Sequence, residues 1–353
     1  MVGLKNVSIV IVNTNEGPVL FECLERISQG GGPYEAIVVD NASDDGSPEQ
    51  VESAYPWVKL VRAASNRGYA GACNLGAGRA RGEILVFLNP DAFVEAGWLE
   101  ALRPLFDDPA IAAAGPRIFR GRRTRELVYD SAGGDIEFPL GDAPGRGYMQ
   151  KAAGQFAVRE DVAYLSGAAL AVRASALEQL GGFDEAFFCY YEETDLCWRI
   201  RMAGLRCVYE PAATVYHLGS FTFGKASARK VYLQTRNRIR SCLQNLQGLN
   251  VVRFAAAELF VGACVIVATT AAAKYRAYAG AYMRAWLDVA CGLPAILRIR
   301  KVRQATRVVS DRRILAQHRR VGVVAAIRRY ARFARYGGDA LFAEGIGAVT
   351  PAE

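Results

Sequence analysis

Carboxylates crowd together in one aromatic-rich stretch of the chain, residues 183–199. Glu192, Glu193 and Asp195 lie within four residues of one another there. At the start of a helix such acids repel one another, and neighbouring aromatic rings exclude water from them. Both effects raise carboxyl pKa values, which prepares one group to act as a general base. A solvated acidic turn with a capping box is the alternative, and we consider it the weaker interpretation.

Another acid follows directly after an apolar run. Asp40 ends the run 36–39 and precedes the polar, glycine-containing segment 41–47. A carboxylate at the end of a strand can accept a hydrogen bond from a ring N–H of a nucleotide base. Taken alone, however, the segment fits an Asx turn that caps the next helix better.

A third acidic motif, Asn89-Pro90-Asp91, follows the apolar run 84–88. A carboxylate at the end of a parallel strand is a plausible ligand for Mg²⁺ or Mn²⁺, ions that take further oxygens from water and from a diphosphate. An N-cap for the next helix is the alternative. His217, one of only two histidines, follows a strand-like run. A lone histidine is more often structural, but the acidic cluster upstream favours metal binding.

The segment 66–74 is rich in small residues. Its glycines, Gly68 among them, would let the backbone approach a ligand, and Arg67 could face a phosphate. The segment lacks the dinucleotide-binding glycine spacing. A tight turn packed between a helix and the sheet explains it equally well.

The elements that must position these side chains alternate along the chain. Apolar runs predict strands and amphipathic patterns predict helices; the strands cover 7–12, 36–39, 58–61, 84–88, 111–115 and 169–172, and the helices 18–28, 69–80, 98–106, 175–180 and 193–203. This order predicts an α/β fold with a mostly parallel sheet, whose ligands bind beyond the carboxyl ends of the strands. The glycine-rich and proline-rich stretch 133–154 predicts a long mobile loop, either a surface insertion or a lid.

The last third of the chain differs in charge. Residues 221–353 hold 23 Lys and Arg against 6 Asp and Glu, a net charge of +17, whereas residues 1–220 carry −9. Apolar stretches at 254–273 and 285–297 precede the basic run 298–303. We therefore expect a catalytic domain over 1–225 and a basic helical region over 226–353. Such a region suits an anionic membrane surface, although a helical bundle that neutralises the acidic domain is the alternative.

The cysteines indicate the compartment. None of the eight forms a C-x-x-C pair, and most lie in apolar surroundings. The first residues lack the charged and apolar regions of a secretory signal. We expect a reducing, cytoplasmic location, on the inner face of the plasma membrane.

Taken together, the motifs resemble family 2 of the inverting nucleotide-sugar glycosyltransferases, and most closely its bacterial rhamnosyltransferase-like branch. The resemblance covers about residues 6–220 and rests on seven motifs in order: VSIVIVNTN, VVDNASDDGS, NRGYAGACN, FLNPDA, SGAAL, GGFDEAFFCYYEETDLCWRIRMAG and VYHLG. It implies a GT-A fold, a Rossmann-like, mostly parallel sheet flanked by helices.

The resemblance also implies roles for single residues. Asp40 matches the acid that reads the nucleotide base. Asp91 matches the metal motif, here in an N-P-D form without its first carboxylate, and His217 matches the histidine that completes the metal site. The remaining matches to the nucleotide-sugar-binding segments are Asn13, Asn15, Asn66, Gly68 and Asn89. Arg67, which could face a phosphate, is added to these candidates.

Glu193 matches the catalytic base, although the family usually has Asp at this position. Asp195 matches the following acid, which orients the acceptor or the helix, and Glu192 and Asp195 are the substitutes if Glu193 is not the base. The implied reaction is a single inverting displacement on a nucleotide diphosphate sugar, with Mg²⁺ or Mn²⁺ as cofactor. The acceptor is a hydroxyl of a glycan or of a polyprenyl-diphosphate-linked saccharide, and the branch suggests dTDP-rhamnose as donor.

Three other classes compete with this interpretation. A processive polysaccharide synthase would need several strong membrane spans and a Q-x-x-R-W motif, and no Arg-Trp pair occurs in the chain. The basic region lacks a nucleic-acid-binding motif, so we expect no nucleic-acid partner. A catalytically silent nucleotide-sugar-binding or scaffold protein is the remaining alternative, and Asp91, Glu193 and His217 together argue against it.

Overall fold

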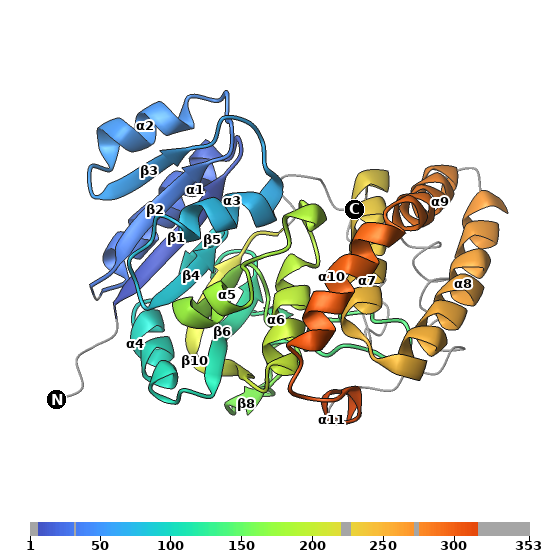
Figure 1. Ribbon diagram of the computed structural model, residues 1–353. Helices are drawn as coiled ribbons and strands as arrows, with labels where there is room; N and C mark the ends of the chain where they lie inside the picture. Colours follow the sequence, from blue (N-terminus) through green and yellow to red (C-terminus); the bar gives the residue numbers. More distant parts are fainter. Residues whose placement is uncertain (1–5, 32, 220–226, 272–274, 317–353) are drawn as a thin grey trace.

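The order of the strands brings the predicted ligand-binding edge together. The computed structural model describes residues 6–31, 33–219, 227–271 and 275–316, and its N-terminal part is built on one sheet with the order β3-β2-β1-β4-β9-β6-β10-β5 (Figure 1). The strands are β1 (Val7–Asn13), β2 (Glu35–Asp40), β3 (Val58–Arg62), β4 (Ile84–Leu88), β5 (Ala92–Val94), β6 (Ile111–Arg120), β7 (Tyr129–Ser131), β8 (Glu160–Asp161), β9 (Ala169–Arg173) and β10 (Arg206–His217).

The first four strands form a parallel half-sheet, as the sequence predicts. β1 pairs in parallel with both β2 and β4, and Asn13 and Asp40 stand opposite each other at the strand ends. Every residue of β1 and β4 is buried, because helices flank the sheet. The polar residues that follow these strands therefore meet at one edge.

The other half of the sheet is mixed. β9 lies antiparallel between β4 and β6, and β5 pairs antiparallel with β10, whereas β6 and β10 are parallel. The strand at 169–172 was predictable from its apolar run, but its direction was not. A strand buried on both faces shows the same continuous apolar pattern in either direction.

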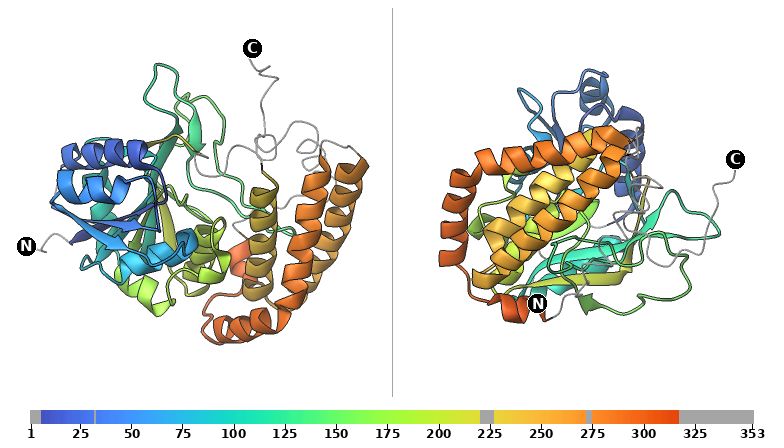
Figure 2. Two further views of the ribbon diagram at one scale, coloured as in Figure 1. Left: turned by 90° about the horizontal axis from the view of Figure 1, so that it is seen from above. Right: turned by 90° about the vertical axis from the view of Figure 1, so that its right-hand side faces the viewer.

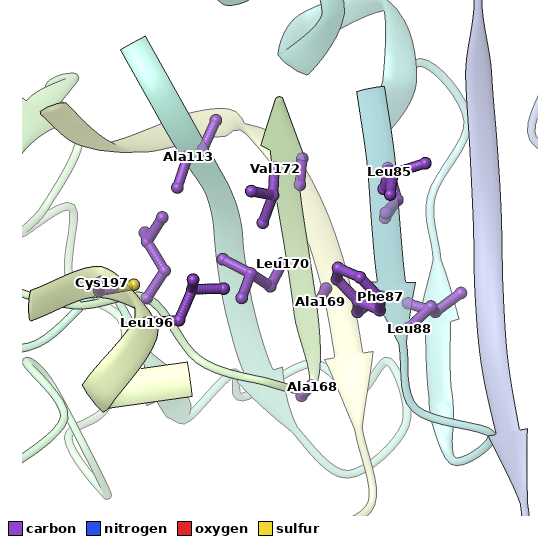
Figure 3. Close-up of a cluster of buried hydrophobic side chains, with 14 of the residues drawn as sticks. Leu85, Phe87, Leu88, Ala113, Ala168, Ala169, Leu170, Val172, Leu196 and Cys197 are labelled. Carbon is purple, nitrogen blue, oxygen red and sulfur yellow. The ribbon is translucent and has the colours of Figure 1, made fainter. Parts of the chain in front are cut away.

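Six helices connect these strands. They are α1 (Gly17–Gln29), α2 (Ser47–Ala54), α3 (Gly68–Ala77), α4 (Trp98–Leu102), α5 (Ala174–Gln179) and α6 (Glu192–Met202). The predicted helix at 98–106 continues from α4 as a 3-10 turn over Arg103–Asp107. Leu196 and Cys197 of α6 are fully buried beside apolar side chains of β4, β6 and β9 (Figure 3). This packing fixes the helix that carries the predicted base.

The stretch 133–154 is packed rather than mobile, which corrects the expectation of an insertion or lid. Leu140 is buried, and Arg238 donates a hydrogen bond to its carbonyl oxygen. The hydroxyl of Tyr191 donates to the carbonyl of Gly141, where a β-carbon would lie 2.2 Å from the sulfur of Cys242. Gly141 thus allows close packing against α7, whereas Gly133, Gly134 and Gly147 pack on side chains of the catalytic part.

The C-terminal part is a helical layer beside the sheet (Figure 2). It consists of α7 (Ala228–Asn245), α8 (Gly248–Ala271), α9 (Arg276–Cys291), α10 (Leu293–Ala305) and α11 (Asp311–Leu315). Within the predicted region 226–353, the described residues 227–271 and 275–316 are mostly helical, and residues 226, 272–274 and 317–353 lie outside the part that the structure describes.

One acid of α6 joins the two parts. Asp195 is completely buried, and its Oδ1 accepts hydrogen bonds from Ser241 Oγ at 2.8 Å, Asn245 Nδ2 at 2.8 Å and Arg303 Nη1 at 2.7 Å. Its Oδ2 accepts from Arg199 Nε at 2.8 Å. Burial alone would raise the pKa of Asp195, but the two arginines outweigh it and lower the pKa to about 2. The carboxylate is therefore charged and fully engaged.

We expect Asp195→Ala to lower the free energy of unfolding by about 3–5 kcal/mol, because it leaves the buried guanidinium of Arg199 without its counter-charge and Arg303 with Asp184 alone. Urea denaturation followed by circular dichroism measures the change. Glu126→Ala removes an exposed ion pair with Lys151 and serves as the control, for which little change is expected. Equal stability of the two variants would contradict the role assigned to Asp195.

Candidate active site

Asp91 and His217 lie together at the carboxyl edge of the sheet. Asp91 precedes β5, and β5 pairs antiparallel with the end of β10, so that His217 stands opposite Ala92. His217 Nε2 is 3.3 Å from Asp91 Oδ1 and 3.5 Å from Asn89 Nδ2. The second oxygen of Asp91 accepts a hydrogen bond from the backbone N–H of Gly219 at 3.0 Å. The strand pairing thus unites the three sequence-predicted residues.

A further acid, Asp130 of β7, holds the other side of the imidazole. Its Oδ2 lies 2.8 Å from His217 Nδ1. Burial would lower the pKa of His217, but the hydrogen bonds and charges of Asp130 and Asp91 outweigh it and raise the pKa to about 10. Sequence analysis missed Asp130, because β7 is three residues long and carries no motif.

This pair can serve as a cation site. Among the described residues, no group of three or more His, Cys, Asp and Glu side chains is arranged to hold a metal ion. A carboxylate oxygen and a ring nitrogen 3.3 Å apart, with the second ring nitrogen bonded to another carboxylate, match the way proteins orient a histidine ligand. With its raised pKa His217 is protonated here, so a cation would have to displace the proton on Nε2. The chain would then supply two ligands and leave the others to water or a bound diphosphate.

The predicted nucleotide-binding turns form one hydrogen-bonded network. Asn13 is buried, and its amide donates to Ser43 Oγ at 3.1 Å and Ser47 Oγ at 2.7 Å. Asn15 accepts from the backbone N–H of Asp44 at 2.8 Å. Asp40 is 4% exposed, and its Oδ1 accepts from the backbone N–H of Ser43 at 3.2 Å. The three predicted residues are therefore adjacent.

Asn41, which sequence analysis did not select, joins this network to the second turn. Its side chain donates to Asn66 Oδ1 at 3.1 Å and accepts from the backbone N–H of Arg67 at 2.8 Å. Arg67 itself is exposed and pairs with Glu185 at 3.2 Å. In this structure the guanidinium of Arg67 thus points to a carboxylate.

Gly68 is required for packing. Its φ is +69°, and a β-carbon there would lie 2.4 Å from the carbonyl oxygen of Phe188. The same oxygen accepts a hydrogen bond from the N–H of Ala70 at 3.2 Å. The tight packing turn considered from the sequence therefore accounts for this glycine.

The turn that contacts Gly68 is strained. Phe188, Tyr190 and Tyr191 have φ values of 65°, 69° and 72°, a region that costs L-residues about 1–2 kcal/mol each. The amide of Asn237 in α7 holds the turn by donating to the carbonyls of Phe187, Cys189 and Tyr190 at 2.7–2.9 Å. Backbone strain that the surroundings maintain is typical of functional sites.

The strained turn leads directly into the predicted base. Glu193 is half-buried against Gly167, and a β-carbon on Gly167 would lie 3.5 Å from its Cγ. Glu192 is buried, and its Oε2 has no hydrogen-bond partner among the described residues. Burial raises the pKa of both carboxyl groups, and for Glu192 the charge of Glu193 adds to the effect. Asp195 lies away from these two, in the interior network described above.

Comparisons with known proteins agree with this geometry. Residues 8–181 match the family model "Glycosyl transferase family 2". The chain is 32% identical, over 62% of its length and 78% of the relative's, to N-acetylglucosaminyl-diphospho-decaprenol L-rhamnosyltransferase of Mycobacterium tuberculosis. It is 33% identical over 49% of its length to the pre-mycofactocin glycosyltransferase of the same species, but spans only 36% of that protein. The chain belongs to glycosyltransferase family 2 and is a glycosyltransferase.

Solved structures share the fold. GalNAc-T7, solved with UDP, GalNAc and Mn²⁺, matches 73% of this chain and 51% of its own at a TM-score of 0.60 and 17% identity. The mannosyltransferase PcManGT from Pyrobaculum calidifontis, solved with GDP-Man and Mn²⁺, covers 96% of this chain and 86% of its own at a TM-score of 0.52 and 20% identity. These likenesses confirm the predicted GT-A fold.

We expect Gly68→Ala to be more destabilising than Gly46→Ala. Both glycines have positive φ, +69° and +77°, but a β-carbon on Gly46 would meet nothing within 4 Å. The backbone penalty of about 1–2 kcal/mol is common to both variants, and the clash with Phe188 adds about 1–3 kcal/mol for Gly68 alone. Urea denaturation of the two variants measures the difference in the free energy of unfolding. Equal losses of stability would mean that Phe188 moves away from the added methyl group at no cost.

Proposed function

We propose that this glycosyltransferase transfers a sugar from a nucleotide diphosphate sugar to an acceptor hydroxyl in one inverting displacement. Glu193 is the general base, and Asp91 and His217 hold a divalent cation. The nucleotide lies on the turns of Asp40 and Asn66. The acceptor is a glycan or a lipid-linked saccharide of cell-surface polysaccharide assembly.

One observation carries the proposal: three candidate elements meet at the segment Gly167-Ala168. Glu193 packs on Gly167, whose carbonyl accepts a hydrogen bond from Tyr69 of α3 at 3.0 Å. The carbonyl of Ala168 accepts from the N–H of Asn89 at 3.0 Å. The base, the donor-side helix and the metal motif therefore surround the same two residues, as a displacement between donor and acceptor requires.

The residues divide the chemistry among them. The raised pKa of Glu193 favours acceptance of a proton from the attacking hydroxyl, and the buried Glu192 beside it opposes a second negative charge. A cation between Asp91 and His217 would neutralise the leaving diphosphate. One displacement from the face opposite the leaving group inverts the anomeric configuration, without a carboxylate nucleophile.

The donor and acceptor are inferred from the relatives. The rhamnosyltransferase of Mycobacterium tuberculosis supports a polyprenyl-diphosphate-linked acceptor and, with it, dTDP-rhamnose as donor. The Mn²⁺ of GalNAc-T7 and PcManGT supports Mn²⁺ or Mg²⁺ as the cation.

An acceptor of this kind lies in a bilayer, and the outer surface of α8 suits one. Among the described residues, α8 is the one helix long and apolar enough to cross a membrane, with a mean hydropathy of 2.1 over Gly248–Thr270 and one-third of it buried. Its acid, Glu258, faces inward to Arg238 at 2.7 Å. Leu259, Phe260 and Val267 are 57–70% exposed. We propose that this face attaches the enzyme to the cytoplasmic leaflet.

The base is tested with Glu193→Gln. Transfer to the acceptor should fall by about 10²–10⁴-fold at every pH, because the general base is lost, while binding of the nucleotide measured by calorimetry is retained. In the wild type, burial raises the pKa of this carboxyl, so activity should fall on acidification at a pH above the ordinary carboxyl range.

Glu192→Gln is the matched comparison. Burial and the charge of Glu193 raise the pKa of Glu192, so Glu192 stays protonated while Glu193 ionises. Its replacement by a neutral amide should therefore leave the acidic fall in activity nearly unchanged while Glu193 remains available. If Glu193→Gln turns over at a near-normal rate, or if Glu192→Gln is the variant that loses activity at every pH, the base is not Glu193.

The cation site is tested by titrating Mn²⁺ into the protein with and without UDP or dTDP. Two protein ligands predict weak binding alone and tighter binding with the diphosphate. Asp130→Asn should weaken the affinity for Mn²⁺ in the presence of nucleotide by about 10–100-fold, because the imidazole of His217 is then no longer oriented by a carboxylate.

Asp108→Asn is the control, since Asp108 is exposed and pairs with Arg206 instead. Tight binding of Mn²⁺ without nucleotide, full transfer in EDTA, or equal effects of the two variants would each contradict the proposed site.

A further inference from the structure

A basic cavity of about 690 Å³ lies between α7 and α9, beside the strained turn. Phe188 of the turn forms part of its wall. Three arginines also line it, Arg229 and Arg236 from α7 and Arg284 from α9. The functions assigned above to the sheet edge make no use of this cavity.

The arginines are held in place by aromatic rings and carbonyl groups. Arg236 Nη2 donates to the carbonyls of Ala186 and Phe187 at 2.9 and 3.0 Å. The guanidinium of Arg284 lies 4.9 Å from the ring centre of Tyr232, and that of Arg229 lies 5.7 Å from the ring centre of Phe188. Fixed guanidinium groups lose little side-chain entropy when they bind an anion.

The cavity carries net positive charge. No acid is among its lining residues, and within the described chain neither Arg236 nor Arg284 forms an ion pair with a carboxylate. Asp288 is nearby in the bundle, where it accepts a hydrogen bond from the hydroxyl of Tyr232. Guanidinium groups bond well to the oxygens of a phosphate or diphosphate. Arg236 is largely engaged with Asn237, Tyr232 and the carbonyls of the turn, so it contributes mainly its charge.

The position of the cavity indicates the acceptor side. It is built from the C-terminal helices and the turn before Glu193, whereas Asp40 and the cation pair lie at the sheet edge. Gly280 and Ala281 of α9 leave room between the basic groups for apolar atoms. The exposed apolar face of α8 belongs to the same helical layer, and α8 packs on α9 (Figure 2).

We infer that this cavity binds the diphosphate of a polyprenyl-diphosphate-linked acceptor through Arg229, Arg236 and Arg284. The inference rests on the proposed function, since it assigns the site of the acceptor in that reaction. The diphosphate would then lie beside Phe188, in the turn that leads into α6 and its candidate base Glu193.

Binding of farnesyl diphosphate, a short soluble member of the class, tests the inference by calorimetry on the full chain. The wild type should bind it more tightly than inorganic pyrophosphate or farnesol, because the site recognises both parts. Arg284→Gln and Arg229→Gln should each weaken binding by about tenfold or more, since a charge-assisted hydrogen bond is lost. Arg298→Gln, an exposed change in α10 outside the cavity, should leave it unchanged.

Three outcomes would overturn the inference. The first is no binding to the wild type, and the second is an equal loss in Arg284→Gln and Arg298→Gln while all variants show the same thermal denaturation midpoint. The third is that UDP displaces farnesyl diphosphate and that Arg284→Gln weakens the binding of UDP as much as that of farnesyl diphosphate. This result would assign the cavity to the donor. Hydrolysis of the nucleotide sugar by the wild type without acceptor is measured in parallel. If nucleoside diphosphate is released while farnesyl diphosphate fails to bind, the proposed function stands and only the assignment of the cavity is wrong.

Discussion

The buried carboxylate of Asp195 is the constraint on which the arrangement of the catalytic helix depends. Charging an acid in the interior is unfavourable unless donors surround it, and here Arg199 of α6 and three residues of α7 and α10 supply them. Because α6 begins at Glu192, its candidate catalytic acids are positioned by side chains of α7 and α10 that lie 46 or more residues beyond Asp195 in the chain. The C-terminal helices are thus part of the catalytic unit. Arg303 extends the connection, since its second nitrogen pairs with Asp184 at 3.0 Å, just before the strained turn.

The sequence predicted what local patterns determine. The parallel strands and the position of α6 follow from apolar runs and amphipathic patterns, and the joint placement of Asp91 and His217 was implied by the family resemblance. The structure adds what depends on contacts between distant segments: the antiparallel entry of β9, the support of His217 by Asp130, and the filling of the space beside Gly68 by Phe188. None of these contacts can be recognised from the neighbouring sequence. An aspartate or a glycine is the same residue type whether it contacts solvent, a ligand or a distant segment of the chain.

The basic C-terminal region packs on the catalytic part, which is one of the two alternatives that the sequence left open, and this packing is compatible with the other. Part of its charge is turned inward, where Arg303 neutralises Asp195 and Asp184, and Arg238 neutralises Asp142 and Glu258. This corresponds to the bundle that packs on the acidic domain. The inward pairing of Glu258 also removes the single acid of α8 from its outer face, so the large side chains exposed on this helix are mostly apolar, with Arg253 as an exposed basic residue. Packing on the catalytic part and attachment to a bilayer are therefore compatible, since they use opposite faces of the helical layer.

The strained turn connects the two proposed substrate sites. Its carbonyl groups accept hydrogen bonds from Asn237 and Arg236 of α7 on one side and from Ala70 of α3 on the other. These contacts from both sides hold Phe188, Tyr190 and Tyr191 at positive φ. Glu192 and Glu193 follow the turn without an intervening residue. The position of the candidate base therefore depends on contacts from both α3 and α7, the helices beside the proposed donor and acceptor sites.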